Sequence, residues 1–540
     1  MKLIRKSSLL ILFLFIGLNA FAQPDPDLPS EEVNIEKQFD AVLREANKKP
    51  TSPSLPPVDT SSAKNQQYLL PPRLLELDYE APTIRPLAMR RAAKEKVYNF
   101  YSKAGLGLPF SLYGEAVYNS GSSERFNFRI GGKHHSMNNN GSFENQRYSH
   151  NNLGIGGTYF SDKGFAIDGD LGLRIDQEHF YGYNNADTTI AKDQVLQRFT
   201  EVDGEFKFFN SLPTQGGINY NAGLNFFSIG DHFQAQEFGV GGTIGFDKWI
   251  NNKHLIAIQI TDHIFNFNDT ITQTNNLFEL EPSLSTNFGV VKVKLGAYVG
   301  FDGDFKVFPD VEILANLLDG KVQIFGGWNG EYRQNNFRSL SKTNPYIVSQ
   351  LTLENTTIQN MYGGVKGQLS NFSYEFRGGY RPADNLVMWV NDFPADTTRF
   401  IPVFGDIDAI NLHATVTAEP VKNLKLFISG DYNTYNSDSL QNVFHLPNFE
   451  FNAGAQYLMF EKLGLKGELY LADGAKYLDA NGNVLNLNTL FDLNFGATYQ
   501  LMKNFSLFLD VNNVVSSKYR RWNGYPQTGV NFLGGVIIKL

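Results

Sequence analysis

The last eleven residues of the chain, 530–540, read VNFLGGVIIKL and decide the fold. Every second residue from Val530 to Leu540 is apolar or glycine, whereas Asn531 and Lys539 fall on the opposite face. Successive side chains of a β-strand point to opposite faces, so this alternation predicts a strand with one face suited to lipid. A last strand of this kind is typical of transmembrane β-barrels.

The beginning of the chain predicts export from the cytoplasm. A short basic region precedes the apolar run 9–18, and Ala20-Phe21-Ala22 then supplies a cleavage site with small residues. We therefore expect residues 1–22 to be a signal peptide and the mature protein to begin at Gln23. No later segment has the roughly 20 consecutive apolar residues of a membrane helix. Export without a helical anchor agrees with a barrel in the outer membrane.

Composition excludes several classes of protein. The 540 residues include no cysteine, which excludes disulfides, a thiol nucleophile, a Cys-ligated metal and a lipoprotein anchor. The 45 Phe, 25 Tyr and 49 Gly residues suit pleated strands with interfacial rings better than helices. The net charge of -8 is mild and its signs are interspersed, so we expect no nucleic acid as partner.

Proline marks a boundary near residue 96. Eleven of the 22 prolines fall between Pro24 and Pro86, and we interpret residues 23–96 as a Pro-rich periplasmic or lumenal extension. Within it, apolar residues at helical spacing predict one helix from Ser30 to Lys48. The basic stretch 86–96 is either a solvated lead-in to the first strand, the simpler interpretation, or a segment in an acidic lumen or on lipid headgroups.

Alternation repeats from Val97 onward. Between 371 and 381, aromatic residues and glycine share one face, while Ser373, Glu375, Arg377 and Arg381 share the other. The same division recurs in 321–332, 423–433 and 491–500. Charged residues on the inner face predict a water-filled interior with lipid outside.

The connections between these strands alternate in length. Counted backward from Leu540, tight turns at 503–504, 419–423, 369–371, 319–320, 251–252 and 162–163 fall at periplasmic positions. Longer polar stretches at 516–527, 473–488, 382–406, 333–355 and 177–192 fall at extracellular ones. The tally predicts an all-β fold, a transmembrane antiparallel barrel of about 22 strands over residues 97–540, with an even number between 16 and 22.

The segment 505–540 resembles the last two strands of TonB-dependent receptors of Gram-negative outer membranes. The resemblance is carried by Val511-Asn512-Asn513, Lys518-Tyr519 and Gly524-Tyr525-Pro526, and it is architectural elsewhere. The chain departs from the family pattern at Val530, where the family often has Arg, and at Leu540, where it has an aromatic residue. The resemblance implies the barrel and its outer-membrane location.

What the family carries ahead of its barrel is not evident here. TonB-dependent receptors have a globular plug domain and a motif that engages TonB, and neither pattern is found in residues 23–96. An unfilled barrel of this size would leak, since barrels of 16–18 strands already hold aqueous channels. Either the open pore is the function of this barrel, or something fills the lumen. The candidates for filling it are the extension 23–96, the loops 333–355 and 382–406 folded inward, and a partner protein.

Residue types that could carry chemistry have simpler explanations in this chain. His134, His135 and His150 flank an Asn-rich loop, but adjacent histidines on a strand point to opposite faces, so solvated loop residues are a better interpretation than a metal site. The oxygen-rich stretches 302–304 and 479–483 fit turn chemistry better than calcium binding. No serine has an activating context. We expect no enzyme activity, no metal and no cofactor.

The sequence therefore predicts a plug-less receptor or channel in the outer membrane for an unidentified solute. Selectivity would come from the lumen-lining residues Glu375, Arg377, Lys425, Asp431 and Asp492. The alternative is an accessory subunit of a multiprotein outer-membrane complex, for assembly or secretion, with an occluded lumen and a protein partner bound through residues 23–96. A soluble secreted β-sandwich is a third interpretation, which detergent-dependent extraction would exclude.

Overall fold

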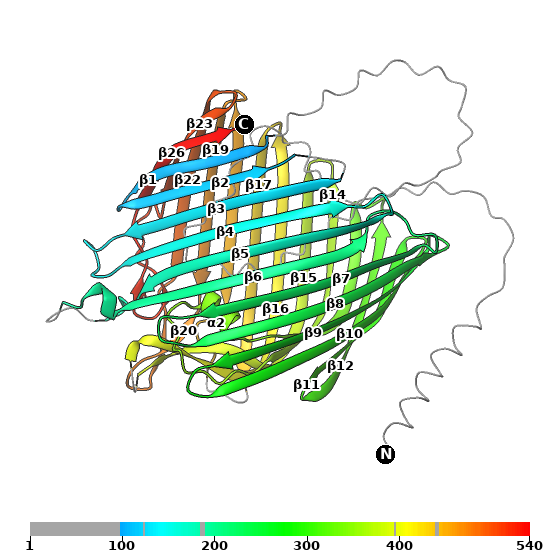
Figure 1. The fold of residues 1–540 in the computed structure, drawn as a ribbon, viewed down its shortest axis with the longest axis horizontal. Coiled ribbons are helices and arrows are strands. Elements are labelled where there is room, and N and C mark those ends of the chain that lie inside the picture. Colours follow the sequence, from blue (N-terminus) through cyan, green and yellow to red (C-terminus); the bar gives the residue numbers. More distant parts are fainter. Residues whose placement is uncertain (1–97, 122–124, 184–188, 394–395, 438–441) are drawn as a thin grey trace. The chain divides into compact units, whose positions relative to one another are not determined.

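A computed structural model describes residues 98–121, 125–183, 189–393, 396–437 and 442–540. Twenty-two antiparallel strands form one sheet, and β1 pairs with both β2 and β26, which closes the sheet into a barrel (Figure 1). The predicted architecture and strand number are confirmed. The predicted signal peptide and the helix at 30–48 lie outside the described residues.

The barrel strands follow the sequence around the wall. They are β1 (Phe100–Leu108), β2 (Ser111–Asn119), β3 (Phe126–Asn138), β4 (Arg147–Phe160), β5 (Phe165–His179), β6 (Leu196–Asn210), β7 (Ile218–Gly230), β8 (Gln236–Ile250), β9 (His254–Asn268), β10 (Thr272–Phe288), β11 (Val291–Asp302), β12 (Asp304–Leu317), β13 (Val322–Arg333), β14 (Thr356–Leu369), β15 (Phe372–Asp392), β16 (Asp396–Val421), β17 (Leu424–Ser437), β18 (Phe449–Met459), β19 (Leu463–Asp473), β22 (Leu490–Met502), β23 (Phe505–Asn512) and β26 (Asn531–Lys539).

Short elements lie in the connections. The described residues include a 3-10 turn, η1 (Lys192–Gln194), and the helix α2 (Phe337–Thr343). Two small hairpins pair β20 (Lys476–Leu478) with β21 (Val484–Asn486) and β24 (Arg520–Trp522) with β25 (Tyr525–Pro526). None of the helices in the described part of the chain is both long and apolar enough to cross a membrane.

The two faces of the wall differ in polarity. On β6, the exposed Val202, Phe206 and Phe208 share one face, whereas Glu201 and Asp203 share the other. A closed barrel satisfies every backbone hydrogen bond of its strands internally, and its apolar outer face suits acyl chains. The protein is an outer-membrane β-barrel.

The connections divide into two ends. At the turn end, where the chain also terminates, strands are joined by short turns such as Ser370-Asn371 and Lys503-Asn504. At the loop end lie the longer connections, among them 334–355 and 513–530. One predicted loop was wrong: 382–406 is mostly hairpin, because the β-forming residues around Trp389 and Phe400 continue the pairing of β15 with β16.

The seam between β1 and β26 shows why glycine is needed there. A Cβ atom on Gly535 would lie 1.9 Å from the Ala104 carbonyl oxygen, so only glycine permits this backbone approach. The inner face mixes charged and apolar residues here, since Lys103 on β1 pairs with Asp510 on β23 at 3.2 Å. Leu533 and Ile537 pack with Tyr113 and Phe508 in a small buried cluster.

Candidate functional site

The connection between β13 and β14, residues 334–355, is named the inner loop. It contains α2, whose N-cap Asn336 accepts a hydrogen bond from the Ser339 backbone N–H. Phe337 and Leu340 are buried, with 0 % and 2 % of their surface exposed. A connection with so much buried apolar surface is packed against other parts of the protein, and its contacts show where it lies.

Ion pairs fasten α2 to the wall at Glu201 on β6. Its carboxylate is 1 % exposed; it lies 2.5 Å from Arg338 Nε, 3.0 Å from Lys342 Nζ and, through its other oxygen, 2.5 Å from an Arg174 guanidinium nitrogen on β5. Burial lowers the pKa of Lys342 to about 8, and Arg174 lowers it further while Glu201 opposes the shift. This group is named the Glu201 cluster. Removing a cation from this set is costly, because Glu201 itself is almost fully buried, whereas Arg338 and Lys342 keep about 30 % of their surface in solvent.

A second carboxylate holds the start of the same helix. Glu237 on β8, 1 % exposed, accepts hydrogen bonds from the backbone N–H groups of Phe337, at 3.0 Å, and Arg338, at 2.9 Å. These N–H groups have no partner within the helix. The Arg338 guanidinium also lies 4.6 Å from the Phe227 ring centroid on β7. Strands β5 to β8 therefore bind α2 through charges, hydrogen bonds and a ring.

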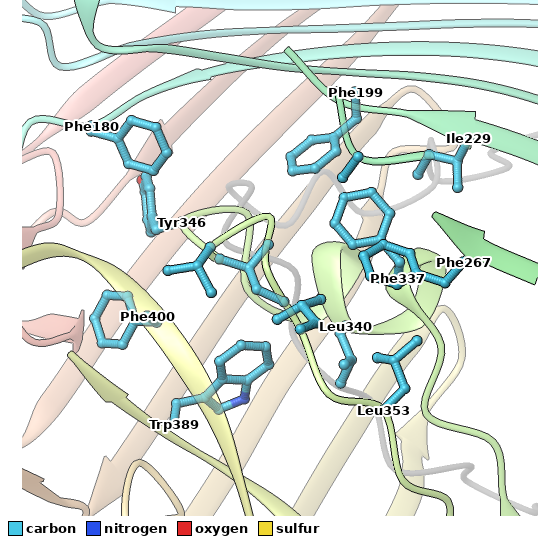
Figure 2. Close-up of a cluster of buried hydrophobic side chains, with 14 of the residues drawn as sticks. Phe180, Phe199, Ile229, Phe267, Phe337, Leu340, Tyr346, Leu353, Trp389 and Phe400 are labelled. Carbon is cyan, nitrogen blue, oxygen red and sulfur yellow. The ribbon is translucent and has the colours of Figure 1, made fainter. Parts of the chain in front are cut away.

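Apolar packing joins these contacts. Phe337 meets the rings of Phe199 and Phe267 at centroid distances of 6.0 and 5.3 Å. Figure 2 shows these side chains together with Leu340 and Leu353 from the inner loop and with Ile229 from the wall. Fully burying side chains of this size is worth about 1.5–3 kcal/mol each. The inner loop is thus held by packing as well as by charge.

Further along, the inner loop pairs with the tip of the β15–β16 hairpin. Ile347 forms a parallel bridge with Phe400 on β16, and Phe400 exchanges backbone hydrogen bonds with Tyr346 and Val348. The neighbouring Arg399 lies over the rings of Phe180 and Phe233, so this tip itself reaches the connections after β5 and β7. The inner loop leaves the wall at β13, contacts inward-facing residues of β6 and β8, and returns to the wall at β14, so it lies across part of the bore. One of the predicted fillers of the lumen, the loop 333–355, is in place.

The return path of the inner loop is also fastened. The Gln273 side chain on β10 donates to the Leu351 carbonyl and accepts from the Leu353 N–H. The Asn355 amide donates to Asn275 on β10 and to Asp302 on β11. The crossing segment is therefore bound along most of its length and is not a free loop.

Other loop-end connections pack over the inner loop. Tyr525 stacks on Tyr346 with ring centroids 3.6 Å apart, and its hydroxyl donates to the Thr398 carbonyl. Trp522 contacts the rings of Phe400 and His445 at 5.5 and 5.3 Å. Together with the inner loop, the β15–β16 tip and residues 442–448 and 513–530 form what we name the loop layer.

His445 joins three parts of the loop layer. Its Nδ1 donates to the Trp389 carbonyl at 2.8 Å, and its Nε2 accepts from the Asn523 N–H at 3.4 Å. One donating and one accepting nitrogen describe a neutral ring. Burial lowers the pKa of His445 to about 4, and the hydrogen bond to Trp389 opposes the shift.

The five residues predicted from the sequence lie on separate parts of the wall. Arg377 and Asp431 come together on β15 and β17 through His413 of β16, which is the register partner of both and lies 2.9 Å from Asp431. Glu375 is on the same face as Arg377, two residues away.

The other two are apart from this row. Lys425, half-exposed and near the turn end, lies 3.5 Å from Glu419. Asp492 is 5 % exposed near the loop end and accepts a hydrogen bond from Tyr519.

The early histidines are not loop residues. His134 and His135 belong to β3 and His150 to β4, because the Asn-rich connection begins only at Asn139. His150 lies 3.1 Å from Asp176 and 3.3 Å from Glu178. Within the described ranges, no group of three or more histidine, aspartate or glutamate residues is arranged to hold a metal ion.

Sequence reasoning missed the residues that hold the inner loop. Glu201 and Glu237 alternate with exposed apolar residues such as Val202 and Phe238, so the period of two could have placed them on the inner wall. Nothing in the sequence pairs them with Arg338 or with the N–H groups of α2. The separations of 137 and about 100 residues are set by barrel closure and not by any local pattern.

Comparison with known proteins supports the fold. No protein-family model matches the chain, and no curated protein matches it. Solved structures do match. The FrpB iron transporter from Neisseria meningitidis is 11% identical over 83% of this chain and 82% of its own, with a TM-score of 0.66.

Two further structures agree with the first. A mutant of the ferric enterobactin receptor PfeA from Pseudomonas aeruginosa is 12% identical, with a TM-score of 0.62, and the copper transporter OprC is 10% identical, with a TM-score of 0.61. Each covers 82% of this chain and 80% of its own. The chain has the barrel fold of TonB-dependent receptors, as the segment 505–540 predicted.

Proposed function

We propose that this protein is a non-catalytic, plug-less outer-membrane receptor or channel whose bore is closed near the loop end by the inner loop. The observation that carries the proposal is the crossing segment itself, which leaves the wall at β13, is bound by the inward-facing Glu201 on β6 and returns at β14. A solute entering from the loop end has to displace it. The solved structures that resemble this barrel are described as transporters and receptors, which supports passage or capture of a solute.

Below the inner loop, the charged inner face would select what passes. We assign this role to Glu375, Arg377, Lys425, Asp431 and Asp492. The row Arg377, His413 and Asp431 offers both signs of charge side by side, which suits a polar or zwitterionic solute better than a simple ion.

The same contacts favour a second function. If the inner loop never moves, the barrel is an occluded accessory subunit of a larger outer-membrane complex, with residues 23–96 engaging a periplasmic protein. The many anchors of the inner loop, from Glu201 to Asn355, support this alternative. The two functions differ in whether the bore can open.

Conductance in a planar bilayer distinguishes them. The full-length chain is compared with a variant in which residues 337–343 are replaced by a glycine-serine linker, and with a variant lacking residues 23–96. A receptor or channel gives a small or intermittent current that the linker variant enlarges. No current in any variant, together with proteins that co-purify only when residues 23–96 are present, would favour the accessory subunit.

A further inference from the structure

Exposed lysines recur in the turns at the turn end of the barrel. Six of its turns each carry one exposed lysine. They are Lys163 (β4–β5), Lys253 (β8–β9), Lys321 (β12–β13), Lys422 (β16–β17), Lys462 (β18–β19) and Lys503 (β22–β23). Acidic residues in the described turns are fewer, namely Asp162, Asp319 and Glu461. The turn end therefore presents a ring of positive charge.

Exposed apolar residues accompany these lysines. Phe460 is 83% exposed, Met502 71% and Leu318 70%, each within three residues of a lysine in the same turn. Val421 precedes Lys422, and Phe288 has its ring centroid 5.6 Å from Lys253 Nζ. Exposing these apolar side chains to water is unfavourable. Beside lysine they suit the interface of a bilayer, where apolar side chains enter the acyl region and ammonium groups contact lipid phosphates.

The lysines are free to bind an anion. None of the six forms an ion pair with a carboxylate in the parts of the chain that the structure describes. Neighbouring basic residues do: Arg125 lies 2.6 Å from Asp162, and Lys425 lies 3.5 Å from Glu419. The difference separates the six turn lysines from ordinary surface charge on this barrel.

We propose that the turn end is a docking surface for the headgroups of anionic phospholipids in the periplasmic leaflet. The short turns of bacterial barrels face the periplasm, so these lysines lie at the depth of that leaflet. Clusters of lysine beside a membrane attract anionic lipid, and the attraction falls off within a Debye length. Phosphate diesters bind the lysines while the apolar tips keep the turns in contact with the membrane.

The distribution of the six lysines favours lipid over a protein partner. They occur in turns from β4–β5 to β22–β23, on successive parts of the whole circumference. A protein partner would select one patch, whereas lipid surrounds a barrel on every side.

Lipid retention tests the proposal. The full-length chain is reconstituted in vesicles of equal parts phosphatidylcholine and phosphatidylglycerol, extracted in mild detergent, and its retained lipids are quantified by mass spectrometry. We expect phosphatidylglycerol to be enriched over its share of the vesicles. The triple variant Lys422→Gln, Lys462→Gln, Lys503→Gln is expected to lose most of that enrichment, because three adjoining turns lose their charge.

A matched control removes the same charge from the loop end. The variant Lys192→Gln, Lys518→Gln, Arg520→Gln alters exposed residues only and is expected to keep the enrichment. A difference in gel mobility between unboiled and boiled samples checks that both variants fold. Equal retention in wild type and turn-end variant, or equal loss in both variants, would overturn the proposal.

The source of the phosphate is tested in the same assay. Inorganic phosphate, matched with chloride at equal ionic strength, is expected to leave the enrichment unchanged. If phosphate alone abolished it, the lysines would bind free anions and the proposal would be wrong. It would also be wrong if the turn-end variant kept its lipid and instead lost a co-purifying protein.

Discussion

The two ends of this barrel use the same strands for different purposes. At the turn end the connections are a few residues long and present lysine and apolar tips outward. At the loop end the connections fold over one another, and one of them crosses the bore and is bound on several sides. Connections too short to pack can only touch the surroundings, whereas long ones can build an interior of their own.

Charge shows the same difference. Glu201 at the loop end is 1 % exposed and has three cationic partners, so its charge holds a segment in place. Lys425 near the turn end has one partner, with both side chains more than half exposed, and an exposed pair of this kind contributes little. Changes near the loop end should therefore affect the state of the bore, and changes near the turn end should not.

The largest expected effect comes from Glu201→Gln. Arg338 and Lys342, about 30 % exposed, would lose their carboxylate partner, and Arg174 would keep only Asp176, so the inner loop should be destabilised by about 1–3 kcal/mol. Limited trypsin digestion of the folded barrel measures this, since Arg338 and Lys342 are cleavage sites within α2. We expect nicking in the variant and resistance in the wild type.

Glu205→Gln is the control for that experiment. Glu205 lies on the same face of β6 and pairs with Lys207 at 2.8 Å, but its side chain is 45% exposed. We expect it to resist trypsin as the wild type does. If Glu201→Gln also resisted, or if both variants were nicked equally, the Glu201 cluster would not be what holds the inner loop.

A smaller effect is expected from pH at His445. Its pKa is about 4 in the folded loop layer and near 6.5 when unfolded, so the unfolded state binds more protons between these values. Stability of the loop layer is therefore complete above pH 6.5 and falls as the pH drops toward 4. Tryptophan fluorescence follows this change, because the Trp389 carbonyl accepts a hydrogen bond from His445 and the Trp522 ring packs against the imidazole.

His445→Gln removes the titration and keeps a donor and an acceptor. The variant is expected to show a weaker fluorescence change between pH 6.5 and 4.5 than the wild type. Identical profiles would mean that other groups govern the response of the loop layer to acid.

The smallest effect is expected from the charged row on the inner wall. Once the inner loop is replaced by a linker, Arg377→Gln should raise the preference for cations on the order of twofold, because one positive charge leaves a water-filled lumen. Reversal potentials across a salt gradient measure it. Lys425→Gln, closer to the turn end and more exposed, should change the ratio less; the opposite order would contradict the assignment of Arg377 to the selective part of the bore.

The strands of the barrel could be predicted from the sequence, but the contacts of the inner loop that lies inside the barrel could not. Alternation from Val97 onward and the segment 505–540 predicted the barrel and its closing strand, because the lipid face imposes a period of two on every strand. The contact of Arg338 with Glu201 could not be predicted, because it depends on which strands closure brings opposite each other.

The error at 382–406 has a related cause. The sequence analysis predicts a loop at 382–406 from its length, although Leu386 to Val390 are β-forming and pair with residues 401–405 of the returning strand. Strands that extend past the membrane keep their hydrogen bonds but lose the lipid-facing pattern. The apolar runs 386–390 and 400–404 were the available signal for such a hairpin.

One measurement tests the crossing segment most directly. The chain has no cysteine, so the double variant Ile347→Cys, Phe400→Cys carries a single thiol pair at neighbouring positions of the inner loop and β16. We predict that the pair forms a disulfide in the folded barrel, seen as a mobility shift that reductant reverses, while Ile347→Cys alone resists a membrane-impermeant thiol reagent. Two free thiols that the reagent labels readily would contradict the account, because the inner loop would then not be held inside the loop layer.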